Sequence, residues 1–219
     1  MTQLILDLGH RPALEEADFL VAPCNRTAIR WLDRWPDWPA PALTLYGPAG
    51  CGKTHLARVF AARSRAPIVR ADHLVTDAVP ALLGSASTCV VDDADHAGAE
   101  PLLHLYNLIA ERRGGVLLTA REPPARWLSL LPDLRSRLVA APAVAVAAPD
   151  DALLAALMVK LFADRQLTVT EELVLFLVRH MERSFEAARR LVADLDAAAL
   201  RDHRGITIPL ARAVLGLTG

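Results

Sequence analysis

Lysine and cysteine are both scarce in this chain. Of its 24 cationic residues only two are lysines, Lys53 and Lys160. The three cysteines, Cys24, Cys51 and Cys89, are widely spaced and form no C-x-x-C pair. This pattern is typical of thiols in a reducing cytosol and argues against a disulfide framework. The seven histidines show no H-E-x-x-H or other ligand spacing, so no zinc site is expected.

Long apolar runs and a strong net charge are also missing. The longest Ala/Val run, residues 139–148, contains Pro142 and is too short to span a membrane. No apolar leader opens the chain, so we expect a cytoplasmic protein without a membrane partner. A net charge of −1 and a hydrophobic content of 53% exclude a disordered tail and give no global attraction to nucleic acid.

A glycine-rich segment stands out in what the sequence does contain. GPAGCGKT, residues 47–54, fits the phosphate-binding pattern G-x-x-x-x-G-K-[ST]. Its glycines would let backbone N–H groups face phosphate oxygens, Lys53 would reach the β- and γ-phosphates, and the Thr54 hydroxyl would hold Mg²⁺. A plain strand-to-helix turn is the alternative, but a lysine kept here by an arginine-using chain favours ADP or ATP with Mg²⁺. The predicted nucleotide-binding residues of this segment and the helix start are Gly47, Pro48, Ala49, Gly50, Cys51, Gly52, Lys53, Thr54 and His55.

Short apolar runs alternate with helical patterns from residue 43 to about residue 147. Strands are predicted over 43–46, near 68, and over 89–92, 116–119 and 143–146; helices are predicted over 54–63, 100–113 and 131–138. Apolar strands between helices indicate a parallel sheet covered on both faces. From Pro149 onward the pattern is helical only, with starts near Asp150, Thr170, Ser184 and Pro209. We therefore predict an α/β P-loop nucleotide-binding domain over 11–148 and a small all-α lid over 149–219.

Two further segments carry chemistry. Residues 89–93, CVVDD, form an apolar strand that ends in two carboxylates. At this distance after the P-loop, Asp92 is predicted to hold Mg²⁺ with Thr54, and Asp93 to orient or deprotonate the attacking water. Residues 131–138, LPDLRSRL, place Arg135 and Arg137 on a short helix. Either could face a neighbouring subunit's phosphate, although spacing alone favours solvated helix charges.

The order of these motifs makes a family resemblance specific. Residues 19–28 together with GPAGCGKTH, VVDDAD, LLTAREPP and LPDLRSRL resemble the AAA+ module of the bacterial replication initiator DnaA. They resemble more closely the Hda family, short DnaA homologues that inactivate DnaA, over nearly the full chain. The resemblance implies that Val21 and Asn25 lie on the adenine side of the pocket. It implies too that Arg137 is a catalytic finger for ATP on DnaA, and that Arg183, in RSFEAA, contacts the nucleotide phosphates.

The N-terminal peptide adds a second resemblance. QLILDL, residues 3–8, is similar to the Q-L-x-L-x-L motif with which the Hda family binds the DNA polymerase III sliding clamp (β subunit). An extended peptide can place alternate side chains in an apolar groove, although an ordinary edge strand explains the periodicity equally well. Residues 1–10 are thus predicted to dock on the clamp through Gln3, Leu4, Leu6 and Leu8.

Departures from the initiator pattern limit the predicted function. The chain stops at Gly219 without a helix-turn-helix domain, so no sequence-specific DNA binding is expected. Arg121 stands where initiators carry an acidic polar sensor, and Thr119 is the candidate substitute. We expect a negative regulator of replication initiation with weak or no turnover of its own, and leave homo-oligomerisation and the choice of ADP or ATP open. The alternatives are a helicase-loader-like ATPase acting on single strands and a nucleotide-binding assembly factor.

Overall fold

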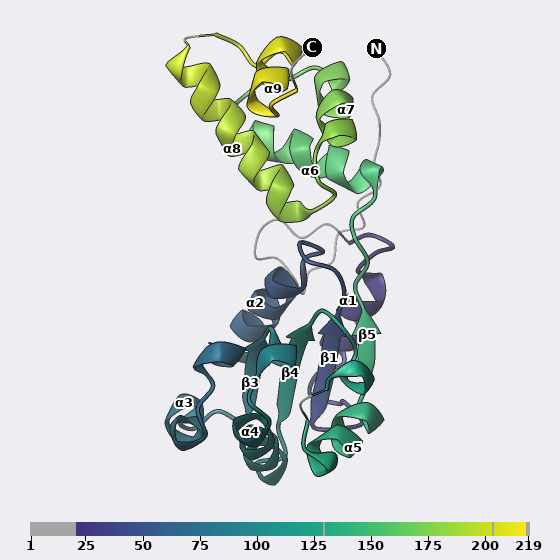
Figure 1. The fold of residues 1–219 in the computed structure, drawn as a ribbon, viewed down its shortest axis with the longest axis vertical. Coiled ribbons are helices and arrows are strands. Elements are labelled where there is room, and N and C mark those ends of the chain that lie inside the picture. The colour runs from purple at the N-terminus through teal and green to yellow at the C-terminus, as the bar shows by residue number, and fades with distance from the viewer. Residues whose placement is uncertain (1–20, 129, 203, 218–219) are drawn as a thin grey trace. The chain divides into compact units, whose positions relative to one another are not determined.

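The computed structural model describes residues 21–128, 130–202 and 204–217. The predicted clamp-binding residues Gln3, Leu4, Leu6 and Leu8 therefore lie outside the described residues. The chain divides into two compact units (Figure 1). The first comprises the chain up to Pro48 together with Gly52–Ala147, and the second comprises Ala49–Cys51 together with the chain from Ala148 onward.

A five-stranded parallel sheet forms the centre of the first unit, in the order β2-β3-β4-β1-β5. Its three central strands are almost wholly buried because helices cover both of their faces. This confirms the predicted α/β class and parallel sheet. The strands are β1 (Ala42–Tyr46), β2 (Ile68–Arg70), β3 (Thr88–Asp92), β4 (Gly115–Ala120) and β5 (Ala143–Ala145).

The helices of the first unit bury apolar stripes against the two faces of the sheet. They are α1 (Arg26–Asp33), α2 (Lys53–Ser64), α3 (Val79–Leu83), α4 (Ala99–Glu111) and α5 (Pro132–Ala140), with 3₁₀ turns at Ala71–His73, Thr76–Ala78, Ala94–His96 and Pro124–Arg126. In α4, the buried Leu102, Leu105 and Ile109 follow helical spacing. They share one core with Val91 and Leu118, which point to the same face of the sheet.

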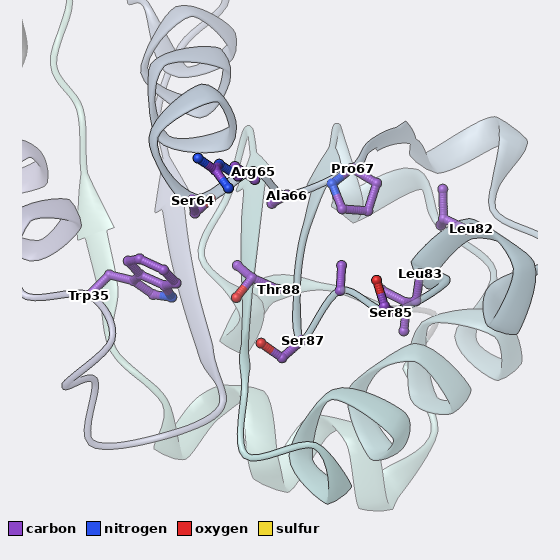
Figure 2. Close-up of a pocket in the computed structure, with 11 residues that line it drawn as sticks. Trp35, Ser64, Arg65, Ala66, Pro67, Leu82, Leu83, Ser85, Ser87 and Thr88 are labelled. Atoms are coloured by element: carbon purple, nitrogen blue, oxygen red, sulfur yellow. The ribbon is translucent and has the colours of Figure 1, made fainter.

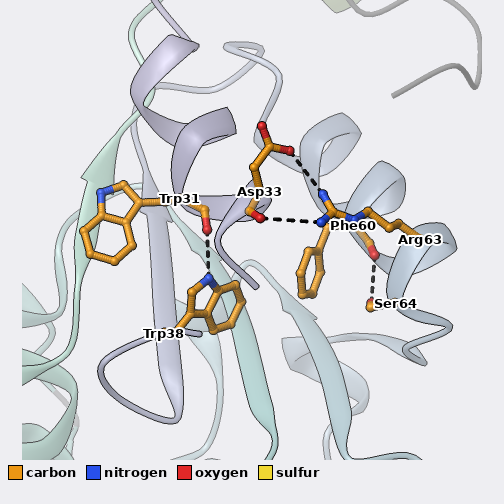
Figure 3. A network of polar contacts seen from close by, with 6 residues as sticks. All are labelled: Trp31, Asp33, Trp38, Phe60, Arg63 and Ser64. Atoms are coloured by element: carbon orange, nitrogen blue, oxygen red, sulfur yellow. Dashed lines mark hydrogen bonds and ion pairs between the residues drawn. The ribbon is translucent and has the colours of Figure 1, made fainter. Parts of the chain in front are cut away.

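Tryptophan side chains pack α1 and the segment after it against α2 (Figure 3). The Trp38 indole Nε1 donates to the Trp31 carbonyl at 2.8 Å, and its ring stacks on Phe60 with 5.4 Å between centroids. Arg63 near the end of α2 pairs with Asp33 at the end of α1, at 3.1 Å. These contacts hold the segment that leads into β1 against α2.

The second unit is helical, as the sequence predicted. It contains α6 (Asp151–Asp164), α7 (Glu171–His180), α8 (Phe185–Arg201) and α9 (Ile208–Val214). Side chains at three helix starts accept hydrogen bonds from the first turn: Asp150 from Leu153 N–H, Thr170 from Leu173 N–H and Ser184 from Ala187 N–H. Across the described residues of both units, no helix has the length and apolar character that a membrane crossing requires.

Candidate functional site

The loop after β1 has the backbone of a phosphate cradle. Gly47, Gly50 and Gly52 have φ angles of 155°, 70° and 99°, which favour glycine because side chains strain this region. The loop runs directly into α2, whose N-cap residue Gly52 provides no side-chain cap. Because N–H groups in the first turn of a helix lack acceptors within that helix, this start suits an anion.

Lys53 holds its amine inside the concave side of the loop. The side chain is only 7% exposed, and its Nζ donates to the carbonyls of Gly47 and Pro48, each at 2.8 Å. A buried ammonium held by backbone oxygens is a fixed positive charge next to the phosphate-binding backbone. The geometry therefore fits a di- or triphosphate.

Thr54 and Asp92 meet at the carboxyl edge of the sheet. The Thr54 hydroxyl lies 3.1 Å from both carboxylate oxygens of Asp92, although the two residues are 38 positions apart in sequence. Hydroxyl, carboxylate and phosphate oxygens are the ligands that Mg²⁺ takes in nucleotide sites. Within the described ranges, no cluster of three or more His, Cys, Asp or Glu side chains could hold a metal alone. A magnesium ion here would depend on nucleotide phosphates, and Thr54 and Asp92 would hold it.

Thr119 links the two carboxylate residues at the tip of β3. Its side chain is fully buried. The hydroxyl donates to Asp92 Oδ1 and accepts from the Asp93 backbone N–H at 3.0 Å. Because a hydroxyl has one hydrogen to donate, Thr119 in this arrangement has no donor left for a phosphate. Asp93 itself is half-buried and takes a left-handed backbone conformation (φ 56°), which turns the chain just after the strand.

Two arginines flank this edge of the sheet. The Arg121 backbone N–H donates to Asp95 Oδ2 at 3.0 Å, and the residue is exposed. Arg70, at the end of β2, is the register partner of Asp92 and was not singled out from the sequence. Its pKa is raised, first by the hydrogen bond to Asp72 and to a smaller extent by the carboxylates of Asp93 and Asp92. The position of Arg70 at the end of a short strand is the sequence signal that could have identified it.

The predicted adenine-side residues lie in the segment that leads into α1. Asn25 is 1% exposed, and its side-chain oxygen accepts from the Ala22 N–H at 2.9 Å. Val21 is half-buried. The Cys24 carbonyl accepts from the Ala147 N–H at 3.0 Å, which ties the segment to the chain after β5. Asn25 thus shapes the segment, and adenine contact by Val21 and Asn25 stays a prediction.

The remaining loop residues differ in exposure. Pro48 and Ala49 are exposed, Cys51 is buried and His55 is half-buried. Arg183 lies in the second unit just before α8, where its guanidinium pairs with Asp151 at 3.0 Å. Its contact with nucleotide phosphates remains a prediction.

The two arginines of α5 have different surroundings. Arg135 donates from Nη1 to the Trp127 carbonyl at 2.9 Å and from Nη2 to the Ala125 carbonyl at 2.7 Å, so it holds the preceding turn. The Arg137 side chain is 38% exposed and donates to Asp133 and Asn107, each at 2.9 Å. Arg137 is therefore a half-buried residue held by side chains of α5 and α4, whereas the exposed Arg135 holds the preceding turn.

A separate pocket of about 620 Å³ lies between the end of α2, the segment after α3 and the start of β3 (Figure 2). Trp35, Arg65 and Thr88 are among the residues that line it. None of the residues predicted to bind nucleotide is among them. The candidate nucleotide site is thus the loop after β1, and this pocket plays no part in it.

Comparisons with known proteins agree with this geometry. Residues 150–215 match the family described as Hda, lid domain. An uncharacterised protein of Haemophilus influenzae is 24% identical over 194 residues, which cover 83% of this chain and 84% of the relative.

Two solved structures resemble this fold over most of the chain. Domain III of the Thermotoga maritima replication initiation protein DnaA has a TM-score of 0.77 at 16% identity, covering 90% of this chain and 93% of that one. AMPPCP-bound DnaA from Aquifex aeolicus has a TM-score of 0.67 at 15% identity, covering 84% of this chain and 67% of that one. At these identities the likeness concerns the fold. Together with the lid match, it supports an Hda/DnaA-like AAA+ protein.

Proposed function

We propose that this protein is a nucleotide-bound negative regulator of replication initiation. It docks on the DNA-loaded sliding clamp and stimulates ATP hydrolysis by DnaA with an arginine finger. The Hda-type lid and the DnaA-like AAA+ fold support a regulator related to replication initiation. The observation that carries the finer proposal is the Arg137 side chain on α5, which is 38% exposed.

The position of Arg137 supports action on another protein's nucleotide. In a parallel sheet, a helix that follows one strand ends near the start of the next. Arg137 lies close to the end of α5, and β5 begins at Ala143. Arg137 therefore lies toward the amino-terminal edge of the strands, whereas Lys53 and Asp92 lie at their carboxyl edge (Figure 1 shows α5 and β1). This placement supports a finger that serves a nucleotide held by a neighbouring molecule.

The surface around α5 also suits a protein contact. Leu128 is 96% exposed, Leu131 is 37% exposed and Val139 is 51% exposed. Three exposed apolar side chains in and just before α5 provide area that a partner could cover. We propose that DnaA covers this surface when Arg137 approaches its ATP.

The protein's own nucleotide has a structural role in this proposal. A DnaA-type AAA+ neighbour was solved with AMPPCP, and the residues here fit a nucleotide with Mg²⁺. The Thr119 hydroxyl already donates its hydrogen to Asp92, and Arg121 replaces an acidic sensor. Few groups are therefore left to help Asp93 align an attacking water. We propose that ADP stays bound and orders the protein, with weak or no turnover, in the cytoplasm.

The test mixes DnaA–ATP, DNA-loaded clamp and this protein, and measures the DnaA-bound ATP that remains with time. Wild type should accelerate hydrolysis. Arg137→Ala should lower the saturated rate by about 10³-fold or to the unstimulated level, since a finger supplied in trans contributes on that scale. Arg190→Ala, which removes an exposed lid arginine paired with Glu186, is the matched control and should act as wild type.

Clamp docking is tested separately by Leu4→Ala. Loss of a tether lowers the effective concentration but not the chemistry. This variant should therefore need more protein for half-maximal stimulation and reach the same plateau. If Arg137→Ala stimulates as well as wild type, the finger proposal is wrong. Rapid ATP turnover by the isolated protein, increased by single-stranded DNA, would favour the helicase-loader-like alternative instead.

A further inference from the structure

Two polar side chains that the sequence did not single out hold the guanidinium of Arg137. Its Nε donates to Asp133 Oδ1 on α5, and its Nη1 donates to Asn107 Oδ1 on α4, both at 2.9 Å. The guanidinium also lies over the Tyr106 ring, 5.5 Å from its centroid. Tyr106 is only 6% exposed and belongs to the core, so the floor beneath the guanidinium is fixed.

The third nitrogen of the same guanidinium, Nη2, can still take a ligand. A guanidinium has five N–H donors in a rigid fork, and the two contacts engage one donor on Nε and one on Nη1. Among the described residues, no acceptor is hydrogen-bonded to Nη2. With the side chain 38% exposed, the Nη2 group can bind an external oxyanion while the Asp133 and Asn107 contacts persist.

We propose that Asn107 and Asp133 are positioning residues that hold Arg137 ready for a phosphate of the partner's nucleotide. This inference rests on the proposed function, because it presumes that Arg137 is the finger. An arginine side chain is otherwise flexible, and its rotamer freedom would be lost at the moment of contact. A guanidinium already fixed on two nitrogens avoids most of that loss. The two acceptors come from different helices, so they define both its place and its plane.

The surroundings of Asp133 suit a residue that orients Arg137 and does not cancel its positive charge. Asp133 is largely exposed and pairs with Arg137 across one turn of α5. An exposed pair of this kind contributes little to folding stability, since water screens it. The carboxylate therefore directs the Nε–H bond without greatly weakening the attraction of Arg137 for a triphosphate.

The activity test uses the full chain with clamp and DnaA–ATP. Asn107→Ala and Asp133→Ala should each lower the saturated hydrolysis rate by about ten-fold or more, because small misplacements of a catalytic group are costly. The protein concentration for half-maximal stimulation should stay within about two-fold of wild type, since the docking surface is intact. Asp133→Asn keeps an acceptor oxygen and should restore most of the rate.

A matched control separates positioning from general damage. Asp164→Ala breaks another i,i+4 pair, with Lys160 in the second unit, and should leave stimulation unchanged. Melting temperatures of all variants, compared with wild type, identify any variant that lowers the rate only by unfolding.

A second readout does not depend on activity. In an NMR spectrum of arginine side chains, the Arg137 Nε–H signal, assigned by its loss in Arg137→Ala, should exchange slowly with water. It should be lost or broadened in Asp133→Ala but kept in Asp133→Asn. If wild type fails to stimulate DnaA, the proposed function is wrong and this signal still tests the grip. If Arg137→Ala abolishes stimulation while both alanine variants keep the wild-type rate, or if the Arg137 signal shows no protection, the positioning role is wrong.

Discussion

The Thr119 hydroxyl connects Asp92 and Asp93 of the candidate site through a single oxygen atom. It sits on β4 between Asp92, to which it donates, and the Asp93 N–H, from which it accepts. The Thr119 side chain is fully buried, whereas Asp92 and Asp93 are half-buried. The hydroxyl therefore fixes where the tip of β3 lies relative to Thr54.

Thr119→Val keeps the shape of the side chain and removes the hydroxyl. We expect the free energy of unfolding to fall by about 1–3 kcal/mol, because two hydrogen bonds, each worth about 0.5–1.5 kcal/mol, are lost. Urea unfolding followed by circular dichroism measures the change. Thr54→Val, at an exposed position whose hydroxyl also meets Asp92, is the control and should cost less than about 1 kcal/mol. Equal losses in the two variants would contradict the linking role of Thr119.

At the scale of elements, the starts of the lid helices offer a contrast between α8 and α9. Ser184 is 3% exposed and caps α8 through its side chain, which accepts from the Ala187 N–H at 3.0 Å. Thr207 stands at the same position before α9 but makes no side-chain cap bond. The residue types are similar, and only the geometry distinguishes them.

Ser184→Ala should destabilise α8 by about 1 kcal/mol, the usual cost of a lost N-cap. Thr207→Ala should change stability by at most a few tenths of that amount. Hydrogen exchange of the α8 amides reports the loss locally, even if the two units unfold in separate steps. Equal exchange in both variants would show that the Ser184 bond contributes nothing.

Periodicity and end signals were sufficient for most elements of this chain. The P-loop, the apolar strands and the capped lid helices were found because each is specified within a short window of sequence. The short helices α1 and α3 were missed. Eight and five residues respectively are too few to be stable helices alone. Packing, such as that of Ile29 and Val79 in the core, stabilises them and is not visible in sequence.

The residues of the site also divide into those that the sequence predicts and those that it does not. The residue types at Lys53, Thr54 and Asp92 could be predicted because a motif or a strand end marks them. The grip on Arg137 could not, since Asn107 lies 30 positions away on another helix. Nor could the sequence show that Arg135 turns back to the Trp127 carbonyl while Arg137 is held by Asp133 and Asn107. Such distinctions depend on which helices pack together, which a single sequence does not specify.

At the scale of the whole molecule, a resident nucleotide should act as part of the fold. A ligand that binds only the folded state adds about 2.7 kcal/mol at a concentration one hundred times its Kd. Adding ADP with Mg²⁺ to nucleotide-free protein should therefore raise the melting temperature by several degrees. Chelating the metal should reduce the shift, because Thr54 and Asp92 are placed to hold Mg²⁺ against the phosphates.

The chain's two lysines provide a test of this prediction and a matched control. Lys53→Ala removes the cation at the loop, so the ADP-dependent shift in melting temperature should vanish. The variant without ADP can also melt at a lower temperature, because the Gly47 and Pro48 carbonyls lose their donor. Lys160→Ala removes the other lysine, which pairs with Asp164 in the second unit, and should keep the full shift. A shift that survives in Lys53→Ala would mean that ADP stabilises the protein from somewhere other than the loop after β1. The nucleotide could then not be the element that orders this site, and its proposed structural role would have to be given up.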